Sequence, residues 1–414
     1  MTKIEIIQAA FKVWGEDRYE TTSLSTLSSA LNVTKAALYH HFKNKDALLD
    51  AMYDTFFDSM SNCLRPYFEE TLACAEHGAG HHEIVKAFLR INMEITSFFV
   101  SNPCYFIFAL VNVHGNMSLV PSVFARMRER GIDFEKLKKI EESINVKNTY
   151  PSLFHMIFST SMCMMANSLR MMRVKEQPAP GAREITERAS AFIRRGLGFS
   201  REKVYALNWE ELEKAAAWRE SIGGGGGRHK RIIKAIASVV AAVGPWAASM
   251  AMIAEKSGLS KSGLYAHFAS KHDMLCQLFM GEFEDVIRHA QAVSRKSDVP
   301  EEQLYLAIRA IEGFLTSEPE FLAAISALKM RRIDFEKMAR LKGARGYQGR
   351  ILQIFSCVKN ASGEALIDET MATVILFILT DMLIRKPASL DYKSIPNESF
   401  RIFYRFIALG IECE

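Results

Sequence analysis

Apolar residues recur at helical spacing along most of the chain. Segments with this periodicity bury one face of a helix, and we find no segment with the apolar-polar alternation of a half-buried strand. The clearest periodic segments are Ile84–Val100, Phe154–Met171, Leu304–Leu315 and Met371–Ile384. The pattern therefore predicts an all-α fold.

One hydrophobic pattern occurs twice. Ser23–Leu49 and Ser249–Leu275 align without a gap at an offset of 226 residues and share 8 identical residues in 27. Such repetition indicates a repeated structural unit. Apolar character is kept at the matched pairs Leu24/Met250, Leu27/Ile253, Val33/Leu259 and Leu48/Met274. The two segments are predicted to share one buried framework.

Each copy predicts two helices joined by a tight turn. The first helix stops at Asn32 or at Gly258, the residue types that best tolerate the left-handed backbone conformation. Thr34 or Ser260 follows and can cap a second helix by accepting a hydrogen bond from its first turn. Helix, short turn, helix is the geometry that places a second helix in the major groove of DNA.

The second helix of each copy has one buried face and one exposed face. Leu38 and Phe42 stand four residues apart and point inward, as do Leu264 and Phe268. The residues predicted to face the groove are Lys35, Ala36, Tyr39 and His40 in the first copy and Lys261, Ser262, Tyr265 and Ala266 in the second. Lysine supplies a donor to a base edge or a phosphate, and a small residue permits close approach. Lys45 and Lys271 begin the next helix, where an ammonium and unpaired N–H groups favour a phosphate.

At these residues the chain resembles the TetR family of bacterial repressors. The second copy matches the family signature at Ile253-Ala254, Gly258-Leu259-Ser260-Lys261, Leu264-Tyr265-Ala266-His267-Phe268 and Lys271. The first copy matches at Thr34-Lys35, Leu38-Tyr39-His40-His41-Phe42 and Lys45, but has Leu27-Ser28 in place of Ile-Ala and Asn32 in place of Gly. The resemblance implies phosphate contacts by Tyr39, Tyr265, Lys45, Lys271, Ser23 and Ser249, and groove contacts by Lys35 and Lys261. Thr34 and Ser260 also belong to the predicted DNA-binding set.

The repeat extends beyond these motifs and divides the chain into two TetR-like units. Gly131–Lys136 recurs as Arg332–Lys337, and Phe192–Leu197 recurs as Phe406–Ile411. We predict a first helix-turn-helix domain at 1–50 and its helical bundle at 51–200. A linker at 201–227 ends in the five glycines Gly223–Gly227, and a second helix-turn-helix domain at 228–275 precedes a second bundle at 276–414. We refer to residues 1–50 and 228–275 as the first and second heads.

Charge differs between the two heads. Residues 228–275 contain seven Lys or Arg and two Asp or Glu, a balance of +5, whereas residues 1–50 contain six of each. The run Arg228-His229-Lys230-Arg231 either follows DNA phosphates or is ordinary solvated charge. The seven cysteines are scattered without a CxxC pair, and we see no signal peptide or membrane-spanning run. A cytoplasmic protein without a membrane partner is predicted.

The first bundle is rich in Met and Phe, which form either a plain core or an adaptable apolar ligand pocket. In the TetR family such bundles hold an inducer, and their last two helices form a four-helix dimer interface. The residues we select for a small apolar effector are Phe98, Phe106, His114, Phe158 and Met162. The His- and Cys-containing segment from Cys74 to Glu83 reads better as a polar loop than as a metal site.

These features predict a DNA-binding transcriptional regulator without cofactor or metal. A ligand-responsive repressor is the favoured form, with the two units pairing in one monomeric chain as a pseudo-dimer on an imperfectly palindromic double-stranded operator. The alternative is a ligand-binding or protein-interaction module in which one or both heads have lost DNA affinity. No nucleophile elbow, phosphate-cradling glycine loop or HExxH motif occurs in the sequence, so enzymatic activity is not predicted.

Overall fold

The computed structural model describes residues 2–16, 23–109, 120–143, 153–175, 182–217, 228–319, 321–322, 351–360, 362–384 and 394–411. Over these residues the fold is all-α, as predicted, and the only extended pairing described is an isolated bridge between Lys359 and Ala365. Among the described helices, none combines the length and apolarity needed to cross a lipid bilayer.

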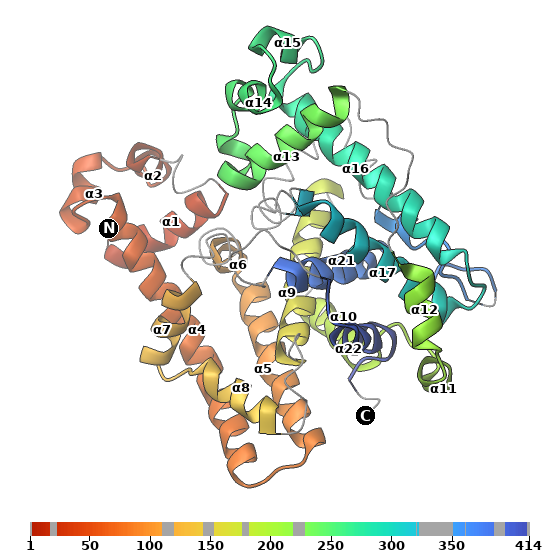
Figure 1. Ribbon diagram of the computed structural model, residues 1–414. Helices are drawn as coiled ribbons and strands as arrows, with labels where there is room; N and C mark the ends of the chain where they lie inside the picture. The colour runs from red at the N-terminus through yellow and green to blue at the C-terminus, as the bar shows by residue number, and fades with distance from the viewer. Residues whose placement is uncertain are drawn as a thin grey trace. The chain divides into compact units, whose positions relative to one another are not determined.

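The chain divides into two compact units (Figure 1). Unit 1 consists mainly of Met1–Asn148 and Ser152–Ser190, and unit 2 mainly of Ala191–Lys329 and Asp334–Glu414. The boundary falls inside a helix, so the last turn of that helix is grouped with unit 2. The boundary between the units, after Ser190, therefore lies ten residues before residue 200, where the sequence predicts the first bundle to end.

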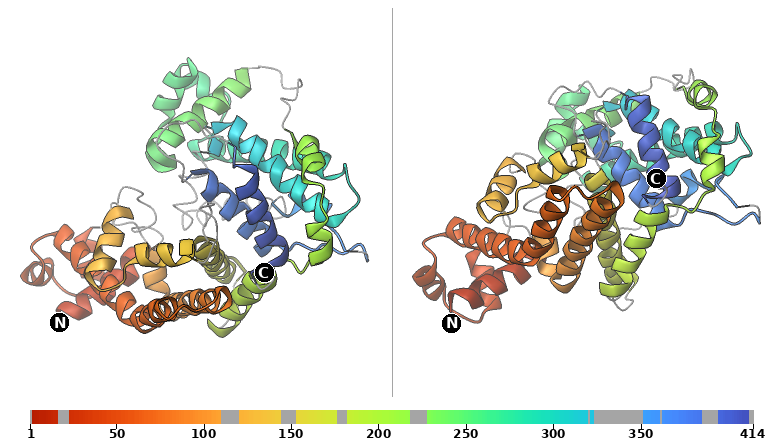
Figure 2. Two further views of the ribbon diagram at one scale, coloured as in Figure 1. Left: turned by 60° about the horizontal axis from the view of Figure 1, so that its bottom comes forward. Right: turned by 90° about the horizontal axis from the view of Figure 1, so that it is seen from below.

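Unit 1 contains the first head and a bundle. Its helices are α1 (Lys3–Glu16), α2 (Leu24–Ala30), α3 (Lys35–His41), α4 (Lys45–Glu76), α5 (His81–Ser101), α6 (Pro103–Phe108), α7 (Val120–Glu129), α8 (Phe134–Ser143), α9 (Leu153–Lys175) and most of α10 (Ala182–Arg195). Figures 1 and 2 show α4 and α5 packed side by side, and α9 packs on α5.

An aromatic cluster joins the first head to this bundle. Phe56 of α4 contacts Phe99, Tyr105 and Phe108 at ring-centroid distances of 6.2, 5.9 and 5.7 Å. Phe11 of α1 contacts the Tyr105 and Phe108 rings at 4.6 and 5.0 Å. Because aromatic pairs contribute beyond their buried area, this cluster fixes α1 against α6.

Unit 2 repeats the arrangement. Its helices are α11 (Arg201–Tyr205), α12 (Trp209–Ala216), α13 (Arg228–Ala247), α14 (Met250–Ser257), α15 (Lys261–Tyr265), α16 (Lys271–Ser294), α17 (Pro300–Ser317), α21 (Glu369–Ile384) and α22 (Asn397–Leu409). α16 packs along α17, and α12 and α21 also contact α17. Pro300 at the first position of α17 suits a helix start, where the N–H that proline lacks has no partner within the helix.

Residues 201–216, which the sequence places in the linker, are built into the core of unit 2. The Trp209 ring contacts Tyr305 at 5.3 Å and Tyr404 at 5.7 Å. Glu213 accepts two hydrogen bonds from the Arg401 guanidinium, at 3.2 and 2.7 Å. The glycine run predicted to be flexible lies outside the described residues.

Candidate nucleic-acid interface

The first head forms a helix-turn-helix from α2 and α3. Ser23 caps α2 by accepting from the Thr26 backbone N–H at 3.3 Å. Thr34 caps α3 by accepting from the Ala37 N–H, also at 3.3 Å. Caps of this kind stabilise a helix start by about 1 kcal/mol. These caps are a structural role for both hydroxyl residues, and the Ser23 hydroxyl also lies 3.3 Å from the Thr26 hydroxyl.

The second head forms the same pair from α14 and α15. Ser249 caps α14 by accepting from the Met252 N–H at 3.2 Å. Ser260 caps α15 by accepting from the Gly263 N–H at 3.0 Å. Thr34 and Ser260 are therefore the caps that the sequence predicts, and Ser23 and Ser249, which the sequence assigns to phosphate contact, also act as caps.

The turn between the helices has one geometry in both heads. Asn32 has φ of 53°, and the Val33 N–H donates to the Ser28 carbonyl at 2.9 Å. In the second head Gly258 has φ of 69°, and Leu259 makes the corresponding hydrogen bond, also at 2.9 Å. Both are left-handed helix ends that satisfy an otherwise unpaired carbonyl. Asn32 is the one non-glycine residue with positive φ in the described parts of the chain.

Large apolar side chains fix the second helix of each pair. Leu38 and Phe42 are 1% and 4% exposed, and Leu264 and Phe268 are 0% and 1% exposed. Burying such side chains stabilises the fold by about 1.5 to 3 kcal/mol each. The inward face predicted from the sequence is the buried face.

The opposite face of each helix is open to solvent. The exposed residues there are Lys35, Ala36, Tyr39 and His40 on α3, and Lys261, Ser262 and Tyr265 on α15 with Ala266 at its C-cap. Tyr39 is 53% exposed and Tyr265 is 48% exposed, which is high for side chains of this size. The structure thus gathers the predicted groove-facing residues on one exposed surface of each head.

Lys45 and Lys271 begin α4 and α16, as predicted, and both are half-buried. Burial lowers the pKa of the Lys271 ammonium. Asn44 and Ser270 cap these helices by accepting from backbone N–H groups at 2.8 and 3.0 Å, a role that the sequence interpretation missed. The signal was present, because asparagine and serine directly before a helix start are typical caps.

Lys43 is a further residue that sequence reasoning missed. It is exposed in the turn between α3 and α4, two residues before Lys45. The second head has Ala269 at the same place in the repeat. Lys43 therefore gives the first head a cation beside the predicted phosphate site that the second head lacks.

The recognition surfaces differ in three further ways. The helix α3 has 7 residues and α15 has 5. On α3 the His40 and His41 rings contact edge to face at 5.3 Å, whereas Ala266 replaces His40 in the second head. In the second head the Ser260 and Ser262 hydroxyls lie 3.1 Å apart. The two heads therefore offer different hydrogen-bonding groups from the same backbone positions.

The basic start of α13 is only partly described. The side chains of Arg228, His229 and Lys230 lie outside the described set, while Arg231 is exposed. Lys234, one turn further along, pairs with Glu318 at 3.7 Å. The contribution of this basic run to DNA contact remains a prediction.

Four of the five residues selected for an apolar effector are described in unit 1, with Phe98 and Phe106 in the aromatic cluster and Phe158 and Met162 on α9, which packs on α5. Phe106 and Met162 are buried, and Phe98 and Phe158 are half-buried. The Phe98 ring contacts Phe99 at 5.4 Å and Tyr105 at 5.8 Å. His114 lies outside the described residues.

The segment from Cys74 to Glu83 lines a cleft of about 490 Å³ between the end of α4 and the start of α5. The His77 ring nitrogen Nδ1 lies 2.6 Å from the Ala73 carbonyl, within its own helix end. In the parts of the chain that the structure describes, no three His, Cys, Asp or Glu side chains are grouped so as to hold a metal ion.

Comparison with known proteins places a family match on each head. Residues 6–52 and 232–278 both match the family described as "Bacterial regulatory proteins, tetR family". Among curated proteins, the chain is similar to the biofilm operon icaADBC HTH-type negative transcriptional regulator IcaR of Staphylococcus aureus strains Newman and COL. Identity is 31% over 62 residues, which is 15% of this chain and 33% of the relative. The chain thus spans about a third of the length of the curated relatives that it matches.

Proposed function

We propose that this chain, which carries two TetR-family DNA-binding domains in tandem, is a transcriptional regulator that binds double-stranded DNA through both heads. The observation that carries the proposal is the duplicated helix-turn-helix. In each copy a Lys and a Tyr are exposed on the second helix above a buried Leu and Phe. IcaR is named as a negative transcriptional regulator, and repression is the sign of regulation that we propose for this chain.

Reciprocal contacts in unit 2 support an intramolecular pseudo-dimer. The Leu197 N–H donates to the Ile407 carbonyl at 2.8 Å, and the Ile411 N–H donates to the Ile193 carbonyl at 3.0 Å. Adding 214 to residue 197 gives 411, and adding 214 to residue 193 gives 407, so each bond is the repeat equivalent of the other. Reciprocal pairing of equivalent residues is the property of an isologous two-fold interface.

The side chains and glycines around these bonds follow the same two-fold relation. Phe192 contacts Phe406, its own equivalent, at 6.4 Å. Gly196 and Gly410 are also equivalent, and a Cβ on Gly196 would lie 2.5 Å from the Ile407 carbonyl oxygen. A Cβ on Gly410 would lie 2.3 Å from the Arg194 backbone. The backbones therefore approach this closely only because neither position has a side chain.

If the surface around Leu197 pairs with its repeat equivalent around Ile411 within one chain, it is not free to pair with a second chain. We therefore propose a monomeric chain that presents two different heads to one operator, with an imperfect inverted repeat as the site. Light scattering of the purified protein tests the assembly. The proposal expects a mass near the 46.7 kDa of one chain, and a dominant mass near twice that value contradicts it.

Regulation by a small apolar molecule fits the contacts inside unit 1. Phe11 belongs to α1 of the first head and packs on Tyr105 and Phe108 of the bundle. A molecule that enters beside Phe98, Phe106, Phe158 and Met162 would alter the packing on which α1 rests, and His114 is the further residue that we assign to this site. Such a molecule releases DNA only if it binds the two conformers with different affinities.

Selection of bound sequences from a random duplex pool tests DNA binding with the full chain. We expect enrichment of one site with two related but unequal halves. Failure to enrich any sequence would favour a ligand-binding or protein-interaction module. A half-site bound without any constraint on the other half would indicate that one head alone contacts DNA.

A further inference from the structure

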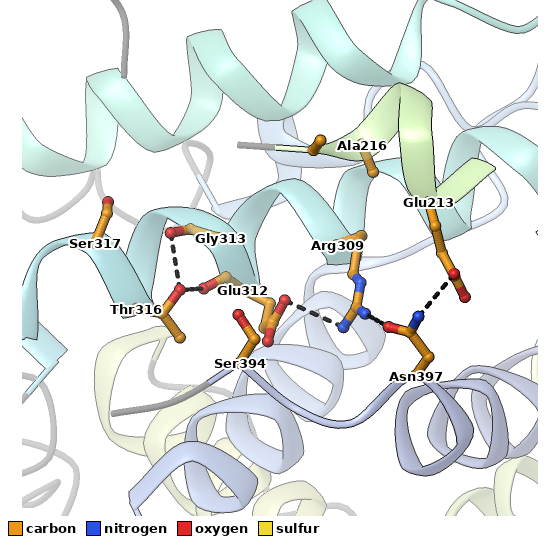
Figure 3. Close-up of a pocket in the computed structure, with 10 residues that line it drawn as sticks. Glu213, Ala216, Arg309, Glu312, Gly313, Thr316, Ser317, Ser394 and Asn397 are labelled. Atoms are coloured by element: carbon orange, nitrogen blue, oxygen red, sulfur yellow. Dashed lines mark hydrogen bonds and ion pairs between the residues drawn. The ribbon is translucent and has the colours of Figure 1, made fainter. Parts of the chain in front are cut away.

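Unit 2 contains a polar cleft that plays no part in the proposed DNA contacts. The cleft has a volume of about 540 Å³ and lies between α12, α17 and the residues that precede and begin α22 (Figure 3). Figure 3 shows Arg309, Glu312 and Thr316 on α17 as one wall. Glu213 of α12 and Asn397 at the start of α22 lie next to each other at the Arg309 end of this wall, joined by a hydrogen bond.

The charged groups of the cleft compensate one another. Arg309 pairs with Glu312 at 3.2 Å, and these side chains are only 11% and 4% exposed. Glu213 pairs with Arg401 at 2.7 Å. Asn397 links the two pairs, because its amide nitrogen donates to Glu213 at 2.7 Å and its oxygen accepts from Arg309. The site is therefore close to neutral, which disfavours a ligand with a large net charge.

Donors and acceptors remain available after these bonds are made. Three of the five Arg309 N–H groups donate, to Glu312, to the Ile395 carbonyl at 3.2 Å and to Asn397, which leaves two. The Thr316 hydroxyl donates to backbone carbonyls at 3.0 Å, and the Ser317 hydroxyl to another at 2.8 Å, so both oxygens can accept. A matching ligand must offer both O–H donors and oxygen acceptors.

One buried hydroxyl of α17, one turn before Arg309, has no hydrogen-bond partner. Tyr305 of α17 is fully buried and its OH makes no hydrogen bond. Burial raises its pKa to about 12, and the charges that act on it are Arg309, Glu213, Arg401 and Glu312. An unpaired buried hydroxyl is unfavourable, and this one lies in the field of the same charged groups that surround the cleft.

We propose that this cleft binds a small neutral polyhydroxyl ring, such as a monosaccharide or the ribose of a nucleoside. One ligand hydroxyl donates to the Glu213 carboxylate while a neighbouring oxygen accepts from Arg309. Arg309 is held in place for this by its stack on the Phe400 ring at 4.3 Å. The site concerns unit 2 alone and is independent of the apolar effector proposed for unit 1.

Ligand-observed NMR on the full chain tests the inference with four probes, namely D-ribose, D-glucose, adenosine and uridine. We expect at least one to bind with a dissociation constant below about 1 mM. Binding of ribose together with both nucleosides identifies the ribose as the recognised part. Binding of glucose alone identifies a monosaccharide site.

Two variants locate the binding in the cleft. Thr316→Trp fills the cleft and should weaken binding at least about tenfold. Glu213→Gln removes a charged acceptor and should weaken it about tenfold. Thr373→Trp is the matched control, because Thr373 is also half-buried in a helix and donates to a backbone carbonyl, at 2.7 Å, but does not line the cleft.

Circular dichroism melting of each variant confirms that it is folded. If Thr316→Trp does not fold, Glu213→Gln decides alone. The inference is overturned if none of the four probes binds at about 10 mM. It is also overturned if the folded cleft variants bind as tightly as the wild type or no more weakly than Thr373→Trp.

Discussion

In the first head Leu38 and Phe42 lie beneath the exposed helix, and in the second head Leu264 and Phe268 lie at the equivalent positions. The caps and the left-handed turn are also equivalent. The exposed positions agree less well, since His40 is replaced by Ala266. Buried and backbone-determining residues are thus shared, while the residues available to a partner differ. Folding of a head therefore depends on the shared buried residues, and its preference for a DNA sequence depends on the exposed residues that differ.

The largest effect is expected where the heads are most alike. Leu38→Ala and Leu264→Ala each remove a fully buried side chain, and each should destabilise its own head by about 2 to 5 kcal/mol. Native-state hydrogen exchange, read separately for α1–α3 and α13–α15, measures both. Loss of protection in both heads from either single change would mean that the heads do not unfold independently.

The next largest loss of stability is expected where the backbone at Gly196 approaches the backbone at its repeat equivalent, Gly410. Gly196→Ala should destabilise unit 2 by about 3 kcal/mol, because the new Cβ meets the Ile407 oxygen at 2.5 Å and φ is +56°. Gly198→Ala is the control, since its φ of +75° is similar but no atom lies within 4 Å, and it should cost about 1 kcal/mol. Urea unfolding compares the two variants. Equal losses of stability would show that the close contact contributes nothing.

The helices and turns were largely predictable from the sequence, since local signals determine them. The periodic segment Ile84–Val100 lies inside α5, and Leu304–Leu315 lies inside α17. Asn32 and Gly258 end their helices as their residue types predict. The exposed face of each head followed from the same spacing.

The place of α12 could not be predicted in this way. Its sequence favours a helix and precedes glycines, which is typical of a linker, and nothing local indicates that Trp209 packs between Tyr305 and Tyr404. Those partners are far away in sequence, so only the tertiary structure brings them together. The unpaired Tyr305 hydroxyl and the cleft lined by Glu213 and Arg309 also depend on contacts between residues distant in sequence.

The charge difference between the heads predicts unequal DNA affinity. Lys261→Ala with Tyr265→Ala should weaken binding to a nonspecific duplex more than Lys35→Ala with Tyr39→Ala, on the order of tenfold against a few-fold. Each pair should lower the salt slope by about 1, for the lysine removed. Fluorescence anisotropy across salt concentrations measures both quantities, with Lys214→Ala on α12 as the control. Equal losses of affinity from the two double substitutions would show that the two heads present equal charge to DNA although their total charges differ.

The smallest expected effect is also the most specific. His40 is exposed on α3, where its ring can donate to or accept from a base edge, whereas Ala266 at the equivalent position cannot do either. His40→Ala should therefore reduce base discrimination by about three- to tenfold in one half of the operator and leave the other half unchanged. His41→Ala is a matched control for loss of an imidazole, since the second head keeps His267 at that position.

Sequence selection with wild type and His40→Ala measures this difference for each half of the site. If two first heads from separate chains bound one operator, both halves would contact a His40, and His40→Ala would reduce base discrimination in both halves. A perfect palindrome in which both halves lose discrimination would falsify the pseudo-dimer, since it would require two copies of the first head on one operator. Loss of discrimination confined to one half requires the two heads of a single site to be different, which is the arrangement that the reciprocal contact between Leu197 and Ile407 favours.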